Sequence, residues 1–298
     1  MRIAITGANG LLGGAAVAQA GADHQVLAIG RGACRLPPGR YTWADADLGD
    51  GASVERALLE FKAEAVLHAG AATDVDGCER DPVLAWRVNV GGTEQVARAC
   101  HVLEARLVAV STDYVFDGTT GDYREDDVVN PRGAYARSKR CGEEAALLLA
   151  PDAAVARVAV VFSGRAGAKS TFATQVIEKL SRGEVVKAFE DQVVSPTLAE
   201  SAAAMTLELL LEHDYRGVLH TSGATRVGRV QFAQQVAALF GLEGTIQPVK
   251  TADVKLPAPR PLKSGLNVDR ATGLLRNRPL TLEEALREFK RQWEGRGR

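Results

Sequence analysis

The sequence contains few cysteines and no cysteine pattern. No two of the four form a Cys-x-x-Cys pair: Cys34, Cys78, Cys100 and Cys141. Isolated thiols in a chain of 298 residues predict reduced side chains in a reducing compartment rather than a disulfide framework. No cysteine has a histidine at metal-ligand spacing and the five histidines are scattered, so we expect no metal site.

Long apolar runs and an excess of one charge are also missing. No uninterrupted apolar run is long enough to span a bilayer. The first twenty residues resemble a signal peptide in outline, but glycines and an asparagine within residues 7–14 interrupt the apolar segment. The formal net charge of −1 gives no reason for attraction to nucleic acid or to an anionic membrane. We therefore expect a cytoplasmic protein with neither of these partners.

In the first half of the sequence, short runs rich in β-branched residues alternate with longer helical patterns. The pattern predicts strands at 2–6, 25–29, 65–69, 107–111 and 154–161. It predicts helices at 11–20, 53–62, 82–99 and 134–149. This order is typical of an α/β protein with a doubly wound parallel sheet of the Rossmann type.

Beyond about residue 162 the pattern becomes irregular. Helices are predicted at 171–181, 197–212, 230–240 and 281–293, the last with a Thr281–Glu284 capping box. We expect a dinucleotide-binding Rossmann domain formed by 1–162, with the chain returning to it at about 193–220. Residues 163–192 and 221–298 would form a smaller α/β substrate-binding lobe.

A glycine-rich turn joins the first strand to the first helix. Its spacing is Gly-x-x-Gly-x-x-Gly, which gives a tight turn, close backbone approach and free N–H groups at a helix N-terminus. The position between strand and helix favours a dinucleotide pyrophosphate over a turn without a ligand. The predicted cofactor-binding residues here are Gly7, Asn9, Gly10, Leu11, Leu12 and Gly13.

The end of the second strand bears on the choice of cofactor. An NAD site usually has an acidic residue there, but this chain has Arg31. Arg31, helped by Arg35, could pair with the 2′-phosphate of NADP(H); the alternative is two solvated arginines. We expect NADP(H), with NAD(H) left open. Asp47 and Leu48 follow a third strand, where side chains can flank the adenine.

The candidate catalytic residues lie on a helix and on the strand before it. Tyr135 and Lys139 are one helical turn apart on the same face. A nearby ammonium and the positive nicotinamide of the oxidised cofactor would lower the pKa of the tyrosine and allow it to exchange a proton. Thr112 ends a central strand, where such sheets bind ligands, although it could instead cap a turn. On its own, the Tyr–Lys spacing would often arise by chance.

These motifs together resemble the extended short-chain dehydrogenase/reductase family, and within it the dTDP-4-dehydrorhamnose reductase branch. The resemblance covers nearly the whole chain. It rests on 6–13, 68–76, 89–93, 111–116, 135–139, 191–192, 195–197 and 260–261. It implies that Thr112, Tyr135 and Lys139 are catalytic, the last two also contacting the cofactor.

The resemblance implies further site residues. Ala69, Gly70 and Ala71 would line the cofactor, and Asn89 would hold the local helix geometry. The residues facing the sugar nucleotide would be Thr73, Val75, Asp113 and Arg260. The chain departs from the branch near Val160, where an aromatic Trp is usual and none is present, so the sugar is left open.

The predicted activity is NADPH-dependent reduction of the C4 ketone of a nucleotide-linked sugar. One alternative is a nucleotide-sugar epimerase or dehydratase on the same scaffold; Tyr114 stands where dehydratases usually have an acidic residue. Another is a non-catalytic NADP-binding regulatory subunit resembling the beta subunit of methionine adenosyltransferase. Retention of Thr112, Tyr135 and Lys139 favours an enzyme. A homodimer is left open.

Overall fold

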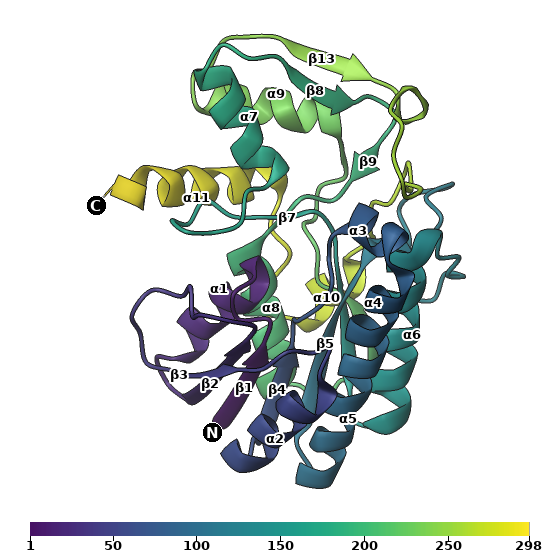
Figure 1. The fold of residues 1–298 in the computed structure, drawn as a ribbon. Coiled ribbons are helices and arrows are strands. Elements are labelled where there is room, and N and C mark those ends of the chain that lie inside the picture. Colours follow the sequence, from purple (N-terminus) through teal and green to yellow (C-terminus); the bar gives the residue numbers. More distant parts are fainter. Residues whose placement is uncertain (298) are drawn as a thin grey trace.

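A seven-stranded parallel sheet forms the larger part of the molecule in the computed structural model, which describes residues 1–297 (Figure 1). The strand order is β3-β2-β1-β4-β5-β6-β11. The strands are β1 (Arg2–Thr6), β2 (Gln25–Gly30), β3 (Thr42–Asp45), β4 (Ala65–His68), β5 (Arg106–Thr112), β6 (Ala154–Val158) and β11 (Gly217–His220). All neighbouring pairs are parallel, which confirms the predicted doubly wound α/β fold.

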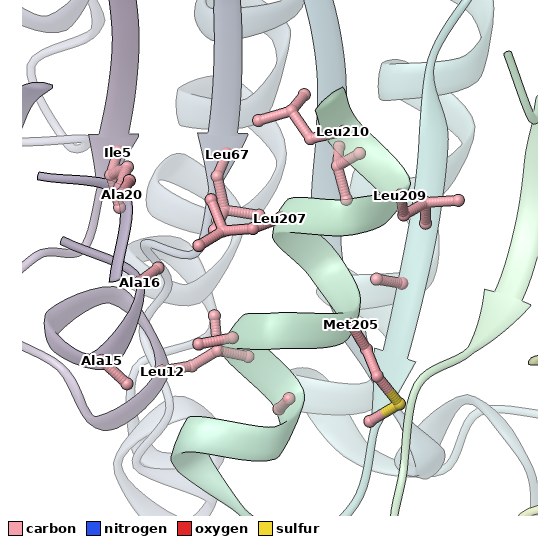
Figure 2. Packing of buried hydrophobic residues seen from close by; sticks show 14 of the residues in the cluster. Ile5, Leu12, Ala15, Ala16, Ala20, Leu67, Met205, Leu207, Leu209 and Leu210 are labelled. Carbon is pink, nitrogen blue, oxygen red and sulfur yellow. The ribbon is translucent and has the colours of Figure 1, made fainter. Parts of the chain in front are cut away.

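Helices cover both faces of this sheet. One face carries α1 (Leu11–Ala20), α8 (Ala199–Leu211) and α10 (Asp269–Leu274); the other carries α2 (Gly51–Phe61), α5 (Gly92–Leu103) and α6 (Gly133–Leu149). In Figure 2, Leu207 and Leu210 of α8 extend toward Leu67 of β4, and Leu12 of α1 packs against α8. Burying one such side chain stabilises the fold by about 1.5–3 kcal/mol.

The segment predicted as one helix at 82–99 is helical, but the type of helix changes along it. It consists of α4 (Pro82–Trp86), a π-helical turn over Arg87–Gly91 and then α5. A π turn widens the helix by one residue and reorients the side chains on it. The short helix α3 (Val75–Arg80) precedes it. Hydrophobic periodicity does not reveal such a local insertion.

The strand predicted at 154–161 was too long. β6 ends at Val158, and Val160 has a φ of +41°, a left-handed conformation in which a β-branched residue cannot continue a strand. The chain then forms β7 (Val161–Phe162), which pairs with β10 (Thr197–Leu198). Because Thr197 and Leu198 belong to β10, the helix predicted from residue 197 begins only at residue 199.

The smaller lobe lies over the edge of the sheet formed by the carboxyl ends of its strands (Figure 1). Its strands are β8 (Val186–Phe189) beside β13 (Ile246–Val249), and β9 (Val193–Val194) beside β12 (Val227–Gly228). Its helices are α7 (Phe172–Ser181), α9 (Arg229–Leu239) and α11 (Leu282–Glu294). Short 3-10 turns occupy Asp113–Val115, Thr251–Asp253 and Gly295–Gly297. The predicted capping box at Thr281 and Glu284 is present, whereas the predicted domain boundaries stay a prediction.

Candidate active site

The glycine turn has the shape that a dinucleotide needs. Gly7 has a φ of +67°, and a Cβ on it would lie 2.6 Å from the Cα of Gly70. A Cβ on Gly13 would lie 2.3 Å from the carbonyl oxygen of Gly7. Gly10 caps α1 without a side-chain hydrogen bond, and the first turn of α1 has no acidic residue. The first N–H groups of α1 are therefore suited to an anion, and the turn fits a pyrophosphate.

Asn9 connects this turn to the loop after β2. Its Oδ1 accepts a hydrogen bond from the backbone N–H of Arg35 at 2.9 Å, and its Nδ2 donates to the carbonyl oxygen of Ala33 at 3.1 Å. The side chain of Leu12 is part of the core, while Leu11 is only partly buried. The contribution expected of these two leucines to cofactor binding would thus be made by their backbone.

Arg31 lies at the end of β2 with its side chain 76% exposed. Its Nη1 is 3.6 Å from Asp47 Oδ2, and an exposed pair of this kind contributes little. The guanidinium is therefore accessible to another anion. Leu48 packs close to Gly70, where an added Cβ would lie 2.4 Å from Leu48 Cδ1.

A chain of buried hydrogen bonds begins at the backbone of Gly70, one of the predicted cofactor residues Ala69, Gly70 and Ala71. The N–H of Gly70 donates to Thr6 Oγ1 at 3.1 Å, Thr6 Oγ1 lies 2.7 Å from His68 Nδ1, and His68 Nε2 lies 3.1 Å from Thr93 Oγ1. The Thr93 hydroxyl donates to a backbone carbonyl. Its oxygen must therefore accept from Nε2–H, and Nδ1 accepts from Thr6. Burial lowers the pKa of His68 to about 3, so the ring is neutral.

Asn89, in the π-helical turn, carries this network to the catalytic helix. Its Oδ1 accepts from the N–H of Ala72 at 2.8 Å, and its Nδ2 donates to the carbonyl of Ala72 and, at 2.9 Å, to Ser138 Oγ. Ser138 Oγ donates to the carbonyl oxygen of Tyr135 at 2.9 Å. The side chain thus fixes the loop after β4 relative to α6, which agrees with the positional role expected of Asn89.

The three predicted catalytic residues lie on adjoining elements. Thr112 is the last residue of β5, and Tyr135 and Lys139 occupy one face of α6; all three are buried. Lys139 Nζ donates to the carbonyl oxygen of Val110 in β5 at 2.8 Å. The ring of Tyr135 packs edge-on against Tyr114, with 5.7 Å between the ring centroids.

Burial shifts the pKa values of three side chains in the site, those of Tyr135, Lys139 and Asp113. Burial raises the pKa of Tyr135 in the protein alone, whereas the sequence predicted a lowered pKa beside the Lys139 ammonium and the positive nicotinamide of the oxidised cofactor. Desolvation of the phenolate is the largest cause, and the negative charge of Asp113 adds to it. Burial also lowers the pKa of Lys139 to about 8 and raises that of Asp113 to about 6. A protonated Tyr135 can still act as an acid.

The predicted substrate residues have different environments. Thr73 is exposed before α3, and Val75 packs beside Tyr135. Asp113 is buried, and its Oδ1 accepts from Thr112 Oγ1 at 3.1 Å. Arg260 has an acidic partner that the sequence did not indicate.

That partner is Asp76. Arg260 Nη2 donates to Asp76 Oδ2 at 2.8 Å, and its Nη1 donates to the carbonyl of Ala258 at 2.9 Å. The buried charge of Arg260 is thus already compensated within the protein.

The family model for the RmlD substrate binding domain matches residues 1–294. The chain belongs to the RmlD family.

Several relatives of this RmlD-family chain are named as reductases. It is 38% identical over 274 residues to a dTDP-4-dehydrorhamnose reductase of Mycobacterium tuberculosis, covering 89% of this chain and 84% of the relative. It is 34% identical over 286 residues to the probable low-salt glycan biosynthesis reductase Agl14 of Haloferax volcanii, covering 95% of each. The structure of dTDP-4-dehydrorhamnose reductase from Bacillus anthracis in complex with NADP superposes with a TM-score of 0.84 at 26% identity, covering 98% of this chain and 99% of that one. This RmlD-family chain is an oxidoreductase.

The RmlD-family site also includes an ion pair that the sequence did not reveal. Glu143 of α6 accepts two hydrogen bonds from Arg157 of β6, each 2.8 Å, and both side chains are buried. Glu143 lies one turn beyond Lys139 on α6. A bidentate pair of this kind anchors the catalytic helix to the sheet. Within residues 1–297 no helix is long and apolar enough to cross a membrane, and no cluster of three or more His, Cys, Asp or Glu could hold a metal ion.

Proposed function

We propose that this protein reduces the C4 ketone of a nucleotide-linked 4-keto sugar with NADPH, in the manner of the dTDP-4-dehydrorhamnose reductases that it resembles. One observation carries the proposal. The buried side chains of Thr112, Tyr135 and Lys139 meet at the carboxyl end of β5, the edge at which open α/β sheets bind ligands.

The glycine turn supports the cofactor assignment. Gly7, Gly10 and Gly13 allow the backbone of the turn to close tightly at the start of α1, where a pyrophosphate would bind to the free N–H groups, and Arg31 would pair with a 2′-phosphate. Bound NADPH would supply the hydride. NAD(H) stays open as a second cofactor, since the Arg31 side chain is exposed and does not by itself exclude it.

Tyr135 would give its proton to the oxygen that develops charge at C4. The raised pKa of its phenol keeps this proton in place until a stronger base, the sugar alkoxide, forms beside it. Lys139, held by the carbonyl of Val110, would place an ammonium near the tyrosine and the cofactor ribose.

The Thr112 hydroxyl would have to leave Asp113 Oδ1 in order to donate to the substrate carbonyl. A donor aimed at a developing oxyanion contributes about 3 kcal/mol to lowering the barrier.

The test is a panel of nucleotide-linked 4-keto sugars, with NADPH oxidation followed by absorbance. We expect turnover with at least one dTDP-linked sugar and strict dependence on the reduced cofactor. Tight NADPH binding without turnover of any ketosugar would favour a regulatory subunit instead. Product with inverted configuration and no net NADPH consumption would indicate an epimerase.

Two lesser proposals accompany the activity. A cytoplasmic location is supported by the four cysteines, all free in the described residues. A homodimer is consistent with the exposed apolar side chains of Val83 and Trp86 on α4. Fractionation and light scattering, respectively, test them.

A further inference from the structure

Two arginines of the smaller lobe lie near the catalytic residues, and they differ in how their charge is compensated. Arg260 is bonded to the carboxylate of Asp76 at 2.8 Å. Arg229, the first residue of α9, has no carboxylate within 4 Å in residues 1–297. A partly buried positive charge without a negative partner is unfavourable, so Arg229 has a charge that the protein itself leaves uncompensated.

The side chain of Arg229 is held firmly by neutral groups. Its Nε donates to Gln192 Oε1 at 2.8 Å, its backbone N–H donates to the carbonyl of Gln192 at 3.1 Å, and its Cζ lies 5.6 Å from the centroid of the Phe172 ring. Gln192 is itself buried and donates to Thr251 Oγ1 at 3.0 Å. Because only Nε is bonded to a side chain, both Nη groups stay available to a ligand.

The charge of Arg229 acts on the reaction centre. Its field favours the ionised forms of Asp113 and Tyr114, and desolvation lowers the pKa of Arg229 itself. Arg229 and Arg260 also repel each other. The guanidinium is therefore within electrostatic range both of the residues at the end of β5, where the sugar would react, and of Arg260, the arginine predicted to approach the diphosphate.

Asp113 does not serve as the missing partner. Its Oδ1 accepts from Thr112, and its Oδ2, although buried, has no hydrogen-bond partner in residues 1–297. The charges of Asp113 and Arg229 influence each other, but no ion pair within 4 Å joins them in residues 1–297, so Asp113 does not occupy the Nη groups of Arg229.

We propose that Arg229 binds the phosphate group of the substrate that is bonded to the sugar. This inference rests on the proposed function and assigns a residue that the sequence motifs did not single out. A guanidinium whose Nη groups are both free presents parallel donors that match two phosphate oxygens. Prior fixation by Gln192 and Phe172 reduces the side-chain entropy lost on binding.

The experiment compares Arg229→Gln and Arg229→Lys with a control, Arg226→Gln. Arg226 is three residues earlier, and its partner Asp122 lies 2.6 Å away near the surface. Steady-state reduction of dTDP-4-dehydrorhamnose with NADPH gives kcat and KM, and calorimetry with dTDP gives a Kd that does not depend on catalysis. NADPH affinity is measured separately.

For Arg229→Gln we expect KM and the Kd of dTDP to rise about 10-fold to 100-fold, the value of charge-assisted hydrogen bonds to phosphate. kcat should change by less than about threefold, because the contact serves the ground state and the transition state alike. Arg229→Lys should recover part of the affinity, and its remaining deficit should shrink at high salt. Arg226→Gln and NADPH affinity should be unchanged.

The proposal is overturned if Arg229→Gln is folded and binds dTDP as the wild type does, or if only kcat falls. If Arg229→Gln does not fold, Arg229→Lys carries the test: wild-type KM in that variant would contradict a bidentate contact. Failure of the proposed function has a different signature, since wild-type protein would then turn over none of the ketosugars.

Discussion

Replacing Asp113 with Asn should make the protein more stable at neutral pH and not at acidic pH. Asp113 is buried, and burial raises the pKa of its carboxyl from 3.8 to about 6 although Thr112 Oγ1 donates a hydrogen bond to its Oδ1. The folded protein therefore holds a carboxylate at neutral pH in a place that disfavours its charge. Asn has nearly the same shape, and its Oδ1 can accept the same hydrogen bond from Thr112.

The sign follows from proton linkage. The folded state retains the Asp113 proton to higher pH than the unfolded chain does, so stability is lost as pH rises from about 4 to about 6 and the loss is complete above that range. A tenfold change in a protonation equilibrium corresponds to about 1.4 kcal/mol. The change from 3.8 to about 6 thus corresponds to at most about 3 kcal/mol, and we expect about 1–3 kcal/mol.

Urea unfolding at pH 4 and at pH 7.5 measures this directly. The stability of Asp113→Asn relative to wild type should be about 1–3 kcal/mol more favourable at pH 7.5 than at pH 4. Asp23→Asn, measured in the same way, is the control, because Asp23 is exposed and its side chain forms no ion pair in residues 1–297. An Asp113→Asn effect that is independent of pH would refute the reasoning.

Three further predictions concern arginines and the buried ion pair. Arg31→Ala should reduce the preference for NADPH over NADH about tenfold; an unchanged ratio of the two kcat/KM values would contradict it. Arg260→Ala should raise KM with little change in kcat, and the reverse pattern would exclude a substrate contact. Glu143→Gln leaves Arg157 buried without a counter-charge and should lower the free energy of unfolding by about 3–5 kcal/mol; urea unfolding with no shift in midpoint would show that the pair is dispensable.

The parts of the fold that the sequence predicts are those specified by local patterns. The apolar runs of the central strands and the helical periodicities between them identified the sheet. The glycine turn at residues 7–13 identified the cofactor edge. Tyr135 and Lys139 needed only their spacing, since one turn of helix places i and i+4 on the same face. Thr112 followed from its position at the end of β5.

The remainder depends on contacts between segments far apart in the chain. The partner of Arg260 is Asp76, 184 residues away, and no pattern near either residue indicates the pair. The bond between Glu143 and Arg157 likewise requires the packing of α6 against β6. Burial, which raises the pKa of Tyr135 in the protein alone, is likewise a property of the whole fold, and the lowered pKa beside the oxidised cofactor stays a prediction.

The site network shows the same limitation. The route from Thr6 through His68 and Thr93 to Asn89 crosses four elements, β1, β4, α5 and the π-helical turn, and no local pattern in the sequence predicts it. Val160 interrupts its strand through a backbone conformation that is uncommon for its residue type.

The most direct test of the account is the turnover of Tyr135→Phe with NADPH and dTDP-4-dehydrorhamnose. Phe keeps the ring and its packing against Tyr114, so folding and NADPH affinity should be nearly unchanged. Loss of the proton donor should lower kcat about 10²-fold to 10⁴-fold. Lys139→Met, measured beside it, should lower kcat and also weaken NADPH binding. A Tyr135→Phe protein that reduces the ketosugar at nearly the wild-type rate would contradict the assignment of Tyr135 as the acid.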